Sequence, residues 1–145
     1  MKKSLVLSIA AVVLFSFGSI AQKNKKVSVP SAVKSALTNK YPASSSAKIT
    51  WETEKGNYEA NWGGKSGEDN SVQFTPGGEF IEIMQAIPAT QLPKPIQAYV
   101  RIHFKQTKIT EAGKITHANG KITYMAEVNK KEMPFDENGN PLSEK

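Results

Sequence analysis

The sequence contains no cysteine. The chain therefore cannot form disulfides, cannot carry a lipid on an N-terminal cysteine, and has no thiolate to bind a metal. It has only two histidines, and no cluster of acidic residues accompanies them in the sequence. A serine nucleophile elbow and a metalloprotease helix motif are also missing. We expect no metal, no cofactor and no catalytic residues, and we expect that the protein is not an enzyme.

Long apolar runs are scarce, and the longest uncharged stretch lies at the N-terminus. Leu5 to Phe17 carries no charge, two lysines precede it, and Ser19-Ile20-Ala21 supplies the small residues of a cleavage site. This stretch is shorter than the ~20 residues that a membrane-spanning helix needs. We interpret residues 1–21 as a signal peptide cleaved after Ala21. The mature chain would be periplasmic or secreted and would have no membrane span.

Charge of one sign does not dominate the remaining chain. Without Lys2 and Lys3, 17 basic and 13 acidic side chains remain, a net charge of about +4. Three lysines crowd residues 23–26, which is fewer than the ~4–8 of a typical lipid-binding cluster. We read them as a solvated tail and expect neither nucleic acid nor a membrane surface as a partner.

Two segments with the same pattern organise what is present. Val29–Tyr41 and Leu92–Phe104 each open with an apolar residue and proline, and then carry apolar residues at helical spacing, at a constant offset of 63 residues. The pattern predicts two amphipathic helices, each followed by short strands. We expect two tandem repeats, residues 22–86 and 87–145, that form one continuous module.

The strands are predicted from alternation of apolar and polar residues. Ile49 to Thr53 and Tyr58 to Trp62 would pair around Glu54-Lys55-Gly56-Asn57, so that Thr53 faces Tyr58 and Trp51 faces Ala60. A third strand would carry Val72 and Phe74, and Phe80 to Met84 would return after a proline–glycine turn. In the second half, Asn119-Gly120 favours a type I′ hairpin with His117 opposite Ile122.

Strand parity then predicts one sheet face that points away from both helices. Its candidate partner-binding residues are Thr50, Glu52, Glu59, Asn61, Lys114, Thr116, Thr123, Met125 and Glu127. Glu52 and Glu59 share this face and could form a carboxylate pair, but no residue near them in the sequence predicts a raised pKa. Met125 would be an apolar residue in water, which suits a binding surface.

The proline-led helices, the Tyr-x-Ala-x-apolar strands at Tyr58 and Tyr124, and the glycine turns after Phe74 and Phe135 resemble the PepSY-like family. That family is itself similar to the β-lactamase inhibitory protein. The resemblance implies an α+β fold, with helices on one face of a curved antiparallel sheet. It also implies an exported protein that is related to domains that bind or inhibit enzymes. The paired cysteines of the inhibitory protein are missing here, and no stretch matches its contact loops.

Two functions of different classes remain open. The first is a non-enzymatic module that binds or inhibits an envelope or periplasmic protein through its open sheet face. The second is a small-ligand carrier or envelope structural protein that uses a cleft between the repeats, which would require an enclosed apolar pocket.

Overall fold

The computed structural model describes residues 26–143. The expected signal peptide, residues 1–21, lies outside the described residues. Among the residues described, no helix is both long enough and apolar enough to cross a membrane.

Two short α-helices form at the two segments predicted from the sequence. Helix α1 spans Ser31–Lys40 and helix α2 spans Lys94–His103. Each follows a proline, Pro30 or Pro93, whose fixed φ suits the residue before a helix. Each ends where an aromatic N–H bonds back to the last turn, Tyr41 to the Leu37 oxygen and Phe104 to the Val100 oxygen, both at 2.8 Å. Short 3-10 helices, η1 (Pro42–Ser46) and η2 (Ala89–Gln91), lie beside them.

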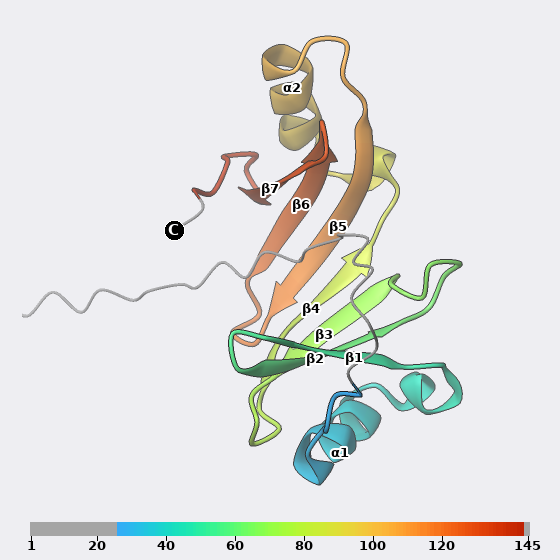
Figure 1. Cartoon of the computed structure of the whole chain (residues 1–145). Coiled ribbons are helices and arrows are strands. Elements are labelled where there is room, and N and C mark those ends of the chain that lie inside the picture. Colours follow the sequence, from blue (N-terminus) through green and yellow to red (C-terminus); the bar gives the residue numbers. More distant parts are fainter. Residues whose placement is uncertain (1–25, 144–145) are drawn as a thin grey trace, which may run out of the picture.

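Seven strands form a single antiparallel sheet in which every strand pairs with its neighbours in sequence. Their bounds are β1 (Thr50–Glu54), β2 (Asn57–Trp62), β3 (Asn70–Phe74), β4 (Phe80–Ala86), β5 (Ile109–His117), β6 (Ile122–Val128) and β7 (Lys131–Asp136). The expected last strand near Pro141 is reduced to a single bridge with Phe135. Figure 1 shows the twisted sheet running between α1 at one end and α2 at the other.

Each helix covers one end of the sheet with its own apolar cluster. Val33 and Leu37 of α1 pack with side chains of β2, β3 and β4, among them Ala60, Val72 and Phe74. The equivalent cluster of α2 buries Leu92, Ile96, Val100, Ala112, Ala126, Val128 and Phe135. Burial of this apolar surface is the main source of stability for a chain without disulfides.

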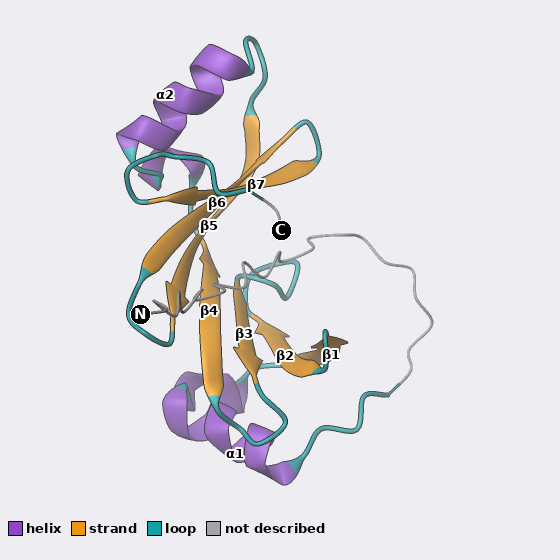
Figure 2. Cartoon of the chain, turned by 90° about the vertical axis from the view of Figure 1, so that its left-hand side faces the viewer, coloured by secondary structure: helices purple, strands orange, loops and turns teal. Residues whose placement is uncertain are grey.

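Both helices pack against the same side of the sheet. Ala60 pairs with Val72, Val72 with Ile83, Ile83 with Thr116 and Thr116 with Ile122, so these residues share one face. Tyr124 and Ala126, which pack beneath α2, lie on that same face of β6. Figure 2 shows the two helices at opposite ends of the sheet. The fold is therefore α+β, as the resemblance implied.

The register of the first hairpin was predicted correctly, and that of the β5–β6 hairpin was wrong by one residue. Thr53 pairs with Tyr58 and Trp51 with Ala60, as expected. In the second hairpin, however, Thr116 pairs with Ile122, whereas His117 was expected there.

A different turn is the reason for this shift. Ala118, Asn119 and Gly120 form a three-residue loop, because the Gly120 N–H donates to the His117 oxygen and the His117 N–H donates to the Lys121 oxygen. Only Gly120 takes a positive φ, +82°. This geometry is a type I turn followed by a glycine bulge rather than a type I′ turn.

A candidate binding face on the helix-free side of the sheet

We call the sheet side opposite the two helices the helix-free face. Seven glutamates project from its strands, namely Glu52, Glu54, Glu59, Glu82, Glu111, Glu127 and Glu132. Within strands β1 to β7, the two lysines are Lys114 and Lys131, and both lie on the helix side. The face is therefore acidic in a chain whose overall charge is positive.

Seven of the nine predicted face residues lie together on this face. Thr50 and Glu52 are exposed, Glu59 and Glu127 are half-buried, and Asn61, Thr123 and Met125 are buried.

The other two predicted residues, Lys114 and Thr116, lie on the opposite side, so their placement was wrong. Lys114 pairs with Tyr124, and Thr116 pairs with Ile122, on the side that carries the helices. The one-residue shift of the β5–β6 register moves every β5 side chain to the other face.

Met125 is also not the exposed residue that the sequence suggested. Only 3% of it is exposed, and it packs with Met84 and Ile115 in a small apolar cluster on the helix-free face. Gly113 leaves room for this cluster, because a Cβ there would lie 2.9 Å from the Met84 sulfur. Substitution of Met125 by glutamate would therefore disturb packing as well as the surface.

A line of polar side chains crosses five strands of the helix-free face. Glu52 pairs with Glu59, Glu59 with Gln73, Gln73 with Glu82 and Glu82 with His117. We call these five residues the polar row. They lie at one level of the sheet because each is the direct cross-strand neighbour of the next.

Hydrogen bonds fix the first half of the polar row. The Gln73 Nε2 donates to Glu59 Oε2 at 3.0 Å and to Glu54 Oε2 at 3.3 Å. The Ser71 hydroxyl donates to the other Glu59 oxygen at 2.7 Å. These acceptors set the orientation of the Gln73 amide, so its oxygen points away from Glu59.

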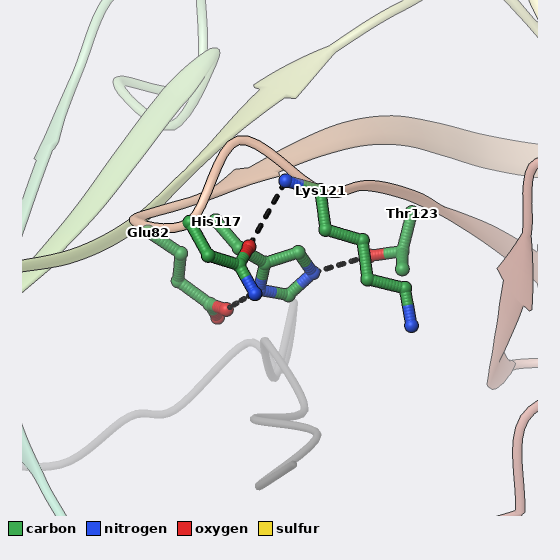
Figure 3. Close-up of polar contacts among 5 residues, drawn as sticks. Glu82, His117, Lys121 and Thr123 are labelled. Atoms are coloured by element: carbon green, nitrogen blue, oxygen red, sulfur yellow. Dashed lines mark hydrogen bonds and ion pairs between the residues drawn. The ribbon is translucent and has the colours of Figure 1, made fainter.

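His117 connects the second half of the row to β6. Its Nδ1 lies 2.7 Å from Glu82 Oε2, and its Nε2 lies 2.8 Å from the Thr123 hydroxyl. Figure 3 shows the imidazole held between these two side chains. Close to it, the Lys121 N–H donates to the Asn119 side-chain oxygen at 2.9 Å. Glu82 is 1% exposed, so this acidic group is almost wholly removed from water.

The backbone closes the hairpin at the same level. The His117 N–H donates to the Lys121 carbonyl oxygen at 2.9 Å, and the Ala118 N–H donates to the Ile81 oxygen at 2.8 Å. The end of β5 is therefore held to both neighbouring chain segments, and the imidazole is positioned by rigid elements.

Two oxygens of the polar row have no hydrogen-bond donor. Gln73 Oε1 and Glu82 Oε1 are both buried, and neither has a hydrogen-bond partner among the residues that the structure describes. Gln73 and Glu82 are direct neighbours on β3 and β4. Since buried polar atoms are nearly always hydrogen-bonded, two adjacent acceptors without a donor are an unusual feature that calls for an explanation.

Burial, and then neighbouring carboxylates, raise the pKa of two glutamates on this part of the face. Burial raises the pKa of Glu52, and the charges of Glu59 and Glu68 raise it further. Burial also raises the pKa of Glu54, with Glu59 adding to the effect and Lys55 opposing it. The expectation of no raised pKa was therefore wrong for Glu52, because folding partly buries this side chain and brings Glu59 and Glu68 close to it.

The loop between β2 and β3 brings a further acid to the same region. Burial raises the pKa of Glu111 on β5, and the charges of Glu127 and Glu68 add to it. Glu68 thus acts on Glu52 at one end of the sheet and on Glu111 near the other. Glu68, in the loop of residues 63–70, therefore lies close enough to the helix-free face to act on two of its carboxylates.

Sequence reasoning missed Gln73, Glu82 and His117 as members of this face. The signal was present in strand alternation, because Gln73 lies between the buried Val72 and Phe74, and Glu82 lies between two isoleucines. Extending the parity of β2 into β3 and β4 would have found both. The position of His117 required the correct β5–β6 register.

A separate hollow of about 390 Å³ lies near the C-terminal end of α2. It is lined by residues of η2, α2 and the segment that leads into β5, among them Val100, Phe104 and Ile109. All of its lining residues belong to the C-terminal half of the chain. It is not a cleft between the two predicted repeats.

Comparisons with solved structures show the same fold at low sequence identity. A Bacteroides eggerthii protein described as a "putative periplasmic" protein is 21% identical, with a TM-score of 0.69, over 81% of this chain and 88% of that chain. A DUF2874 family protein from Bacteroides ovatus is 16% identical, with a TM-score of 0.64, over 81% and 86% of the two chains. A BLIP-like protein from Bacteroides fragilis is 20% identical, with a TM-score of 0.61, over 83% and 88%.

No match to the chain is found among curated proteins. The family model described as "Putative beta-lactamase-inhibitor-like, PepSY-like" matches residues 56–142, which is more than half of the chain. That range runs from the β1–β2 turn to one residue past the bridge at Pro141, and it includes all of the polar row except Glu52. The chain therefore belongs to the PepSY-like family.

Proposed function

We propose that this protein is a non-enzymatic binding module of the cell envelope, and that a protein partner docks on its helix-free face. The observation that carries the proposal is the contrast between the two sides of the sheet. The helix side is filled by two apolar clusters, whereas the opposite side presents an ordered row of polar side chains. Such a surface suits recognition by hydrogen bonds and charge.

The family and the fold support this proposal. The family is described as inhibitor-like, and one protein of the same fold is described as BLIP-like. Export fits the N-terminal sequence, and a protein of the same fold is described as periplasmic. Inhibition of an enzyme is one form that such binding could take. The proposal that the partner docks on the helix-free face is the same whether or not the partner is inhibited.

A tandem duplication is part of the same proposal, with repeats at residues 22–86 and 87–145. Helices α1 and α2 keep the offset of 63 residues at both ends. In each half, a hairpin glycine packs against the first turn of the helix. A Cβ on Gly78 would lie 2.8 Å from the Ala32 oxygen, and a Cβ on Gly139 would lie 2.8 Å from the Pro95 carbonyl carbon. Ala32 and Pro95 are themselves 63 residues apart.

Site-specific crosslinking tests the docking face. A photoreactive amino acid is placed at Glu52 or Glu111, which are exposed on the helix-free face, and, as matched controls, at Lys34 or Arg101, which are exposed on the helices. Each variant is expressed in cells that export it and is irradiated. We expect a protein adduct from positions 52 and 111, and none from positions 34 and 101.

Two results would overturn the proposal. Adducts that form only from the helix positions would move the docking surface to the other side of the molecule. An absence of protein adducts from all four positions would instead favour the small-ligand carrier, with the hollow beside α2 as the place to examine.

A further inference from the structure

Among the described residues, the strands of the helix-free face carry more acidic than basic side chains. Seven glutamates project from its strands, and the lysines within those strands lie on the other side. Lys121, in the segment just before β6, is at the rim beside His117. Carboxylates held close together repel one another, and a cation placed among them would relieve that repulsion.

The polar row also contains two acceptors that find no donor within residues 26–143. Glu82 Oε1 and Gln73 Oε1 belong to direct cross-strand neighbours, and both atoms are buried. The other atoms of these groups are already used, since Glu82 Oε2 contacts His117 and Gln73 Nε2 donates to Glu59 and Glu54. What the pair needs is therefore a donor, and the surrounding charge favours a positive one.

We propose that the helix-free face binds a lysine- or arginine-bearing segment of the protein partner, with one cationic head donating to Glu82 Oε1 and Gln73 Oε1. This inference rests on the proposed function and names the chemistry of the partner. Ammonium and guanidinium groups carry several N–H donors and no acceptor, so they match two acceptor oxygens on neighbouring strands.

The surroundings of the two oxygens suit a long basic side chain. The Met84–Ile115–Met125 cluster lies beside them, because Met84 is two residues from Glu82 on the same face. An aliphatic stem that packs against this cluster keeps its methylene groups in apolar surroundings while its charged end reaches the acid. Of the two hydrogen bonds that the Gln73 Nε2 donates, the one to Glu54 is the longer, at 3.3 Å against 3.0 Å to Glu59, so it is the one that entry of the head would break first.

Peptide titration followed by NMR tests the proposal on the chain that begins at Gln22. The probes are blocked hexalysine and hexa-arginine peptides, with a blocked hexaserine peptide as the uncharged control. We expect the two basic peptides to shift the Gln73 side-chain amide signals, and hexaserine to leave them unchanged.

Two variants with the same charge change separate the polar row from general attraction. Glu82→Gln removes the central carboxylate, and we expect it to raise the Kd for hexalysine by about tenfold. Glu137→Gln removes an exposed carboxylate in the β7 turn, and we expect a change within about twofold. Equal effects of the two variants would mean non-specific attraction and would overturn the proposal.

A third variant keeps the test valid if Glu82→Gln does not fold. Gln73→Met removes the amide oxygen without changing the charge, and we expect it to weaken hexalysine binding by a similar factor. Circular dichroism establishes that each variant is folded. Undiminished binding by a folded Gln73→Met variant would remove Gln73 from the site and overturn the assignment.

The basic residues Lys23, Lys25 and Lys26 are the rival occupant within this chain. If these lysines occupied the face, replacing them with serine would free it, and hexalysine would then bind much more tightly. That result would overturn the proposal that the occupant is a cationic side chain of a partner. A third outcome is that positions 52 and 111 form crosslinks while Glu82→Gln leaves peptide binding unchanged. That outcome would support the docking face and overturn the proposal that the partner docks through a cationic side chain.

Discussion

The carboxylates of the helix-free face lower stability at neutral pH. The pKa values of Glu52, Glu54 and Glu111 are raised in the folded protein, mainly by burial and then by neighbouring negative charges. The folded state therefore binds more protons than the unfolded state between the two sets of pKa values. The stability that these groups contribute is present at low pH and is lost as pH rises from about 4.5 through the folded pKa values.

The first prediction is that Glu52→Gln stabilises the protein at pH 7 and reduces the fall in stability between pH 4.5 and pH 7. Because Glu52 is exposed and its charge is screened, the gain at pH 7 should be under about 0.5 kcal/mol. Urea unfolding across this pH range measures it, with Glu137→Gln as the control. A loss of stability at pH 7 in Glu52→Gln would contradict the account.

Asp136 behaves in the opposite way, and its effect lies outside that pH range. Hydrogen bonds from Asn140, and then from the Asn138 N–H, lower its pKa below 3.8. The stability that Asp136 contributes is present above that value and is lost as pH falls through the lower, folded pKa. Measurements above pH 4.5 therefore report on the glutamates rather than on Asp136.

At the scale of elements, each helix holds its end of the sheet through one apolar stripe. Leu37 is 4% exposed and Ile96 is fully buried, and each lies at the centre of its helix cluster. Truncation of either side chain leaves a cavity that the surrounding strands fill only in part.

The second prediction is that Leu37→Ala and Ile96→Ala each lower the free energy of unfolding by about 2–5 kcal/mol. Lys34→Ala, on the exposed side of α1, should change it by under about 0.5 kcal/mol. Chemical denaturation compares the three variants. Similar small effects in all three would mean that the stripes do not carry the packing.

The hairpin glycines couple the strands to the helices. Gly78 and Gly139 have φ values of +87° and +84°, and a Cβ at either position would collide with helix backbone. Gly120 has a similar φ of +82°, but nothing lies within 4 Å of a Cβ placed there. The three residues therefore separate backbone strain from steric collision.

The third prediction is that Gly120→Ala costs about 1–2 kcal/mol, from the left-handed conformation alone. Gly78→Ala and Gly139→Ala should each cost about 1–3 kcal/mol more, because the helix must also shift. Thermal and urea unfolding of the three variants measure the difference. If Gly120→Ala were as damaging as the other two, the close helix contact would not matter.

The sequence predicted elements well where one residue type determines the geometry. Prolines marked the helix starts, and Gly56 in the turn after β1 led to the correct β1–β2 register. The β5–β6 hairpin was harder, because Asn-Gly fits both a two-residue turn and the end of a three-residue loop. The Asn119 side chain, which accepts a hydrogen bond from the Lys121 N–H, favours the longer loop, and the sequence does not reveal that contact.

The candidate site was predicted only in part for the same reason. Seven of the nine predicted residues share the helix-free face, since their strand parity did not depend on the misassigned hairpin contacts of β5. The burial of Met125 and the raised pKa of Glu52 arise from side chains that are distant in sequence. Such contacts depend on the packed sheet and cannot be read from local alternation.

At the scale of the whole molecule, one continuous sheet has one side that carries both helices and one side that carries neither. Both helices and both large apolar clusters lie on one side, and the acidic polar row lies on the other. The order of the strands follows the chain from β1 to β7, so the two halves join directly through the β4–β5 pair. The polar row crosses that junction from Glu82 to His117, so a docked partner would contact both halves.

Methionine methyl groups provide the most direct test of the claim that a partner docks on the helix-free face. In the chain from Gln22 onward, the methionines are Met84 and Met125 on that face and Met133 on the helix side. Methyl-labelled protein is titrated with the partner recovered by crosslinking, and its NMR signals are followed. The account predicts that the Met84 and Met125 signals shift while Met133 stays unchanged; a shift of Met133 alone would contradict it.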